Sequence, residues 1–192
     1  MRRYLATGLI VSLGLLGLCE SATAENTTDH VVEARGVIQQ FSAALGKELK
    51  TSIETGGPVA ALEVCNLKAP GIAEQVSKAT GWHVGRTALK LRNPRNAPDE
   101  WEKGVLASFA SRVAAGEDIT KIEQTESVDR DGHRMVRYMK AIPTAELCVT
   151  WHGSSLKPEV QTRLLELYPA DQATGFTPGD LRGAFTLTKR LD

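Results

Sequence analysis

The sequence predicts a domain of the α+β class, because helical patterns come first and strand patterns follow, with one further helix between them. Apolar residues recur every three or four positions over residues 31–53, which is the period of an amphipathic helix. Over residues 133–142 polar and apolar residues alternate instead, which is typical of a strand with one buried face. We therefore expect helices combined with a predominantly antiparallel sheet.

The first 24 residues have the pattern of a cleavable secretory signal. Arg2 and Arg3 are basic, residues 9–18 are apolar, and Ala22-Thr23-Ala24 supplies the small side chains of a cleavage site. The apolar run is too short to span a bilayer. We therefore expect a periplasmic domain over residues 25–192 that has no membrane association after cleavage.

Removing the 24-residue signal from the 192 residues leaves 168, with 21 basic and 22 acidic residues once Arg2, Arg3 and Glu20 are gone. This balance gives no reason to expect a nucleic-acid partner. The length suits a single domain, and we find no internal repeat or linker. Two cysteines stay in the mature chain, Cys65 and Cys148, in a compartment where thiols are normally oxidised. They must pair with each other, be held by another group, or be exposed.

The first helix is expected to end at Gly56-Gly57, and a second to start at Pro58, whose fixed φ suits a first turn. On this second helix Cys65 shares a face with apolar residues, so its thiol is expected to point inward. Pro70 has no N–H to bond to the preceding turn. We therefore expect the helix to kink or restart just after Cys65.

The middle of the chain predicts a strand over residues 82–89 and a stiff loop over residues 92–98, where two prolines disfavour a helix. A third helix follows, because acidic residues at 99–102 favour its positive N-terminal end and an apolar face continues to about Gly116.

The remaining elements are mostly strands. Residues 119–128 and 133–142 flank a turn and are expected to form an antiparallel hairpin. A short helix over residues 158–168, a loop rich in glycine and proline, and a final strand over residues 183–191 complete the prediction.

The residues Cys148-Val149-Thr150-Trp151-His152 carry the chemistry. A c-type haem attachment site is Cys, two residues, Cys and then His, so that a thiolate bonds to a vinyl group while the histidine reaches the iron. Cys148 and His152 keep this offset, but Trp151 stands where the second cysteine would be. On its own such a pair is a weak signal.

Around this pair, four blocks of residues occur in order. They are Glu63-Val64-Cys65 with Ala69-Pro70 and Ile72-Ala73; Gly85-Arg86-Thr87 with Leu91-Arg92-Asn93-Pro94, Asn96, Pro98 and Trp101-Glu102; the segment from Cys148 to Gly153; and Tyr168-Pro169, Asp171, Ala173-Thr174-Gly175, Gly179-Asp180 and Arg182-Gly183-Ala184. With these blocks the chain resembles a bacterial family of exported, single-domain c-type haem proteins, formerly a domain of unknown function. The resemblance runs from about Val31 to the C-terminus.

The resemblance implies a PAS-like antiparallel sheet with long N-terminal helices packed against it. It also implies a single haem c as cofactor, with His152 as one axial metal ligand and Cys65 as the other. Cys148 would tether the haem through a single thioether, while Trp151 leaves open a non-covalent haem or its loss. With both axial positions filled, electron transfer or redox sensing with a periplasmic redox partner is more natural than enzymatic turnover, so we expect no enzyme.

Arg86 and Arg92 are candidate partners of the haem propionates, because guanidinium groups bind carboxylates bidentately. The alternative is that they and Arg95 pair internally with the acidic residues at 99–102.

Two alternatives to the haem protein follow from the same residues. A disulfide between Cys65 and Cys148 would make the chain a haem-free ligand-binding or interaction module, and Trp151 is the best argument for it. A thiol catalyst or haem peroxidase built on Cys148 and His152 is less well supported, because no orienting carboxylate or amide stands next to the pair.

Overall fold

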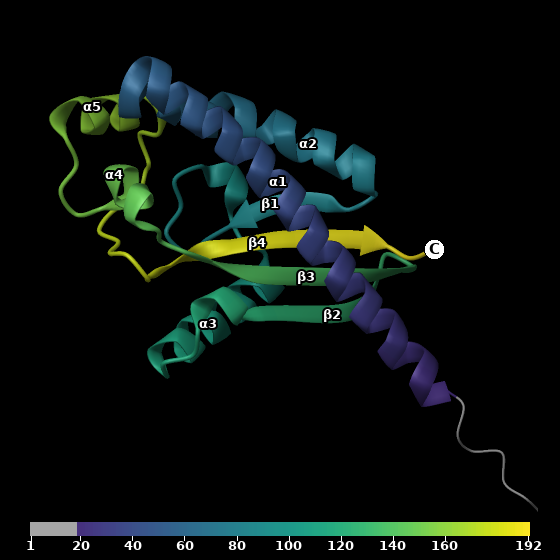
Figure 1. The fold of residues 1–192 in the computed structure, drawn as a ribbon. Helices are drawn as coiled ribbons and strands as arrows, with labels where there is room; N and C mark the ends of the chain where they lie inside the picture. Colours follow the sequence, from purple (N-terminus) through teal and green to yellow (C-terminus); the bar gives the residue numbers. More distant parts are fainter. Residues whose placement is uncertain (1–18) are drawn as a thin grey trace, which may run out of the picture.

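The computed structural model describes residues 19–192, with side chains from residue 27 onward. Its centre is a four-stranded antiparallel sheet, which confirms the α+β class (Figure 1). In spatial order the strands are β1 (His83–Thr87), β4 (Leu181–Arg190), β3 (His133–Pro143) and β2 (Glu123–Arg130). Residues 1–18 of the predicted signal lie outside the described residues, so its cleavage stays a prediction.

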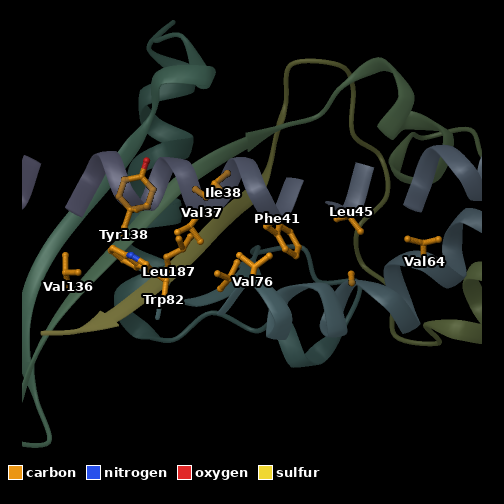
Figure 2. Packing of buried hydrophobic residues seen from close by; sticks show 13 residues of the cluster. Val37, Ile38, Phe41, Leu45, Val64, Val76, Trp82, Val136, Tyr138 and Leu187 are labelled. Carbon is orange, nitrogen blue, oxygen red and sulfur yellow. The ribbon is translucent and has the colours of Figure 1, made fainter. Parts of the chain in front are cut away.

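Helices cover both faces of the sheet (Figure 1). One face packs against α1 (Cys19–Glu63) and α2 (Ala69–Thr80), and the other against α3 (Glu100–Ala114). Figure 2 shows the first of these cores, in which Phe41 of α1 and Tyr138 of β3 are almost fully buried. Tyr138 and its neighbour Met139 belong to different cores, because successive strand residues point to opposite faces.

The predicted hairpin forms with a two-residue turn. Asp131 and Gly132 have positive φ values of 54° and 78°, which gives the twist that tight hairpins prefer. The first arm starts later than predicted, at Glu123, because Ile119–Lys121 form a 3₁₀ turn. The side chain of Asp118 accepts a hydrogen bond from the Thr120 N–H and stabilises that turn.

The expected break at Gly56-Gly57 is a kink inside one long helix. Gly57 has φ 69° and ψ −169°, and the chain resumes helical geometry at Pro58. This backbone conformation is open essentially to glycine alone. The predicted helix ends where the sequence indicates, but the next one follows without a loop, so both are parts of α1.

The predicted irregularity beside Cys65 is confirmed. Residues Val64–Lys68 form a π-helical turn, η1, in which the Ala69 N–H bonds to the Val64 carbonyl. Pro70 then lies in the first turn of α2, where its missing N–H has no consequence. Such widened turns are frequent at functional sites.

Short segments complete the fold around the site. A 3₁₀ turn, η4 (Glu146–Cys148), leads directly into α4 (Val149–His152), and α5 (Pro158–Leu167) follows. A third core joins these segments to α1 and consists of Ala61, Leu62, Trp151, Val160, Leu164 and Tyr168. This core fixes the position of α4 against the kinked part of α1.

Candidate functional site

A cavity of about 250 Å³ lies where η1, β1, η4 and α4 meet. All five residues that the sequence suggests for cofactor binding line its wall: Cys65, Arg86, Arg92, Cys148 and His152. They come from four separate parts of the chain, so the fold brings them together.

His152 is held in one orientation by the backbone. Its Nδ1 lies 2.7 Å from the carbonyl oxygen of Ala173. Since a carbonyl only accepts hydrogen bonds, Nδ1 carries the hydrogen and Nε2 keeps a free lone pair. Burial and the nearby charges of Arg182 and Arg92 lower the pKa of His152 to about 3. The imidazole is therefore neutral at ordinary pH.

Arg182 is the site residue that sequence reasoning missed. Its Nε lies 3.2 Å from Nδ1 and 3.5 Å from Nε2 of His152. Because Nδ1 donates to Ala173, Nε2 is the ring atom that can accept from Arg182. Burial lowers the pKa of Arg182 to about 10, which leaves the guanidinium charged at neutral pH. Its guanidinium also lies 5.3 Å from the centre of the Phe176 ring.

Arg92 has a structural role in this arrangement. It forms an ion pair with Asp171 at 2.9 Å, and both side chains are more than nine-tenths buried. The same guanidinium donates to the carbonyls of Trp151 at 2.6 Å and Ala173 at 3.1 Å. Arg92 thereby holds α4 and the 171–173 loop together. Its assignment to a haem propionate stays a prediction.

Arg86 is the less constrained cation of the cavity. Among the described residues no carboxylate lies within ion-pair distance of it, and its guanidinium lies 5.5 Å from the centre of the Phe41 ring. The internal network considered from the sequence is wrong for this residue. Asp99 and Glu102, at the start of α3, pair instead with Arg137 of β3. They do so because β3 carries this guanidinium over the start of α3.

Both cysteines are free thiols in the structure, and each is partly buried. Burial raises the pKa of the Cys65 thiol, and the charges of Arg86 and Arg92 oppose that effect. Cys148 ends the 3₁₀ turn that leads into α4, so its sulfur and the imidazole of His152 border the same cavity.

A family model described as Tll0287-like matches residues 21–189. The chain belongs to the Tll0287-like family. A solved structure, described as the crystal structure of the cyanobacterial heme-protein Tll0287, has 26% sequence identity to this chain. The match has a TM-score of 0.57 and covers 88% of this chain and 96% of that chain. The predicted relationship to a haem-protein family is thereby confirmed. No curated protein matches the chain.

In this member of the Tll0287-like family Trp151 is an anchor for α4. Its Nε1 donates a hydrogen bond of 2.8 Å to the Pro58 carbonyl, next to the kink of α1. The indole is 9% exposed and packs in the third core, while it also lines the cavity. The residue that interrupts the attachment motif therefore supplies packing and a hydrogen bond that a cysteine cannot.

The described part of the chain contains neither a membrane-spanning helix nor a cluster of metal ligands. No helix in the described part of the chain has the length and apolar character needed to cross a membrane. Within residues 19–192 no three His, Cys, Asp or Glu side chains cluster in a way that could hold a metal ion.

Proposed function

We propose that this chain is a periplasmic haem protein of PAS-like fold that works in electron transfer or redox sensing and has no enzymatic activity. In this proposal His152 and Cys65 would hold the haem iron, and Cys148 would tether the porphyrin through a single thioether. Membership of the Tll0287-like family and the solved heme-protein Tll0287 support the haem assignment.

The orientation of His152 carries the proposal. Histidines that bind metals almost always donate their other ring N–H to a carbonyl or carboxylate, and Nδ1 of His152 does so to Ala173. The low pKa of the ring keeps the lone pair on Nε2 free of a proton. A partly buried, neutral and oriented imidazole that faces a cavity is the state that a metal ligand needs.

The other residues of the cavity fit an anionic porphyrin. Arg86 has no ion-pair partner among the described residues, so it is available to a propionate, whereas Arg92 is largely engaged with Asp171. Bound haem would supply a one-electron couple of the iron, and a thiolate from Cys65 would enrich the iron in electrons and favour its oxidised state. The chain contributes orientation of His152, positive charge near the propionates, and burial.

The volume of the cavity fits haem less well than its charge does. The cavity of about 250 Å³ is below the roughly 300–1,000 Å³ of common ligand sites. The Arg182 Nε lies 3.2 Å from Nδ1 and 3.5 Å from Nε2 of His152, so binding of iron at Nε2 would replace a contact of the Arg182 guanidinium. Once displaced, it would add another cation near the propionates.

The test is the visible spectrum and intact mass of protein purified from the periplasm of cells that contain a cytochrome c maturation system. We expect a Soret band and, after denaturation, a mass increased by one haem. Cys148→Ser should retain colour but release the haem on denaturation, and His152→Ala should change the spectrum. His133→Ala, a histidine at the end of the hairpin, is the matched control. A colourless wild-type protein overturns the proposal.

A haem-free module is the second candidate, and one observation favours it. Cys65 and Cys148 line the same small cavity, and Trp151 fills the position of the second attachment cysteine. In this alternative the sulfurs form a disulfide, and the cavity binds another ligand or none. The same mass measurement distinguishes the two, because this protein would lack visible absorption and be lighter by the two thiol hydrogens.

A further inference from the structure

A second and larger cavity lies beside the first. It has a volume of about 570 Å³ and lies between α2, β1, the 93–97 loop and the start of α3. β1 is an edge strand, so one of its sides pairs with β4 and the other faces this groove (Figure 1). Cys65, Arg86 and Thr87 line both cavities. We call this second cavity the β1 groove.

The β1 groove has more available positive charge than negative charge. Arg86 and Arg95 line it, and no carboxylate of the described residues pairs with either. Arg137 also lines the groove and is 8% exposed, but its charge is engaged with Asp99 and Glu102.

The acidic residues of the groove all have basic partners. Asp99 and Glu102 share Arg137 at 2.8 and 3.5 Å, and Glu74 pairs with Lys78 at 2.6 Å. Arg86 and Arg95 together carry two positive charges, against the one negative charge by which Asp99 and Glu102 outnumber Arg137.

The rest of the lining suits an organic molecule better than a bare inorganic ion. Ala69, Ala73 and Val84 present small or apolar surfaces, and Thr186 and Thr188 add hydroxyls from β4. A volume of about 570 Å³ falls within the roughly 300–1,000 Å³ of small-molecule sites. An inorganic anion would leave most of this space and the apolar wall unused.

We propose that the β1 groove binds a small organic carboxylate, with Arg86 and Arg95 holding the carboxylate group and the α2 wall contacting the carbon chain. Guanidinium forks match carboxylates in geometry, and one cation on β1 and one on the 93–97 loop can approach such a group from two walls. This site adjoins the cavity that His152 faces and shares Arg86 with it, whereas Arg95 lines the β1 groove and not the cavity of His152.

The test is calorimetric titration of the mature chain, as purified from the periplasm, with acetate, succinate, citrate, benzoate and inorganic phosphate to millimolar concentration. We expect saturable one-to-one binding of at least one carboxylate. Arg95→Gln should weaken it about tenfold or more, since Arg95 is exposed and can be changed without loss of fold. Ala73→Phe should abolish it by filling the groove without a change of charge. Arg134→Gln, an exposed arginine on β3, is the matched control and should bind like the wild type.

Three results would overturn the proposal. They are no binding of any carboxylate, binding of phosphate alone, and carboxylate binding that Arg95→Gln and Ala73→Phe retain in full. Circular dichroism of each variant verifies that it is folded. Because the readout is heat of carboxylate binding, a colourless protein that still binds carboxylate refutes the haem assignment and leaves the β1 groove site standing.

Discussion

His152 should make the haem-free chain sensitive to mild acid. Its pKa falls from 6.5 to about 3 on folding, with burial as the largest cause and Arg182 as the next. Below pH 6.5 the unfolded chain therefore takes up a proton on this residue that the folded chain does not. Stability is fully present above the unfolded pKa and is lost as the pH falls towards the folded one.

The magnitude follows from the size of the shift. Each pH unit between 6.5 and 3 removes about 1.4 kcal/mol from the free energy of unfolding. Between pH 7 and pH 5 the loss from His152 alone is roughly 2 kcal/mol. Few carboxylates titrate in that interval, so the effect of the histidine should stand out.

Urea unfolding of the haem-free chain at pH 7, 6 and 5 measures this loss. His152→Gln should lose about 2 kcal/mol less than the wild type between pH 7 and pH 5. Arg182→Gln should fall between them, because one cause of the low pKa is gone. His133→Gln is the matched histidine control. If wild type and His152→Gln lose the same stability over this range, the imidazole is not held neutral by its surroundings and the reasoning fails.

Three further predictions concern stability. Trp151→Ala should lower the free energy of unfolding by about 3–5 kcal/mol and Trp151→Phe by about 1 kcal/mol, as measured by urea unfolding, since only the latter keeps the packing of a large ring. Asp171→Asn should cost about 3–5 kcal/mol in the same assay because it leaves the buried charge of Arg92 unpaired, and an equal stability of the variant would contradict the ion pair. Gly183→Ala should strongly reduce the melting temperature, since the new Cβ would lie 2.4 Å from a backbone oxygen, whereas Gly46→Ala in an open helical position should raise it.

A sequence pattern could predict those elements of the fold whose shape is set by residues close by in the sequence. The π-helical turn next to Cys65 follows from the missing N–H of Pro70, which is visible in the sequence. The stop at Gly57 was predicted as a helix end, and the structure has a kink, because Pro58 resumes the helix at once. Whether a glycine ends or bends a helix depends on the packing that follows, here the contact of the next turns with α5.

The site residues divide in the same way. Cys148 and His152 could be found because a short motif holds them at a fixed offset, and Cys65 because it lies in a block shared with a known family. Arg182 lies in one of the same blocks, but no sequence pattern pairs it with His152, since the two side chains meet only when β4 adds to the sheet. The ion pair of Arg92 and Asp171 joins two loops that are far apart in the sequence, so the sequence pattern could not predict it either.

Trp151 shows why a departure from a motif has to be interpreted with the fold in view. Read from the sequence, it is a lost cysteine and an argument against haem attachment. In the structure it donates to the Pro58 carbonyl beside the kink of α1 and thereby holds α4 in place. The position of His152 depends on α4, so the residue that stands in place of the second motif cysteine also supports the orientation of the imidazole. In the proposed haem protein, this packing would orient the histidine without a second covalent bond to the haem.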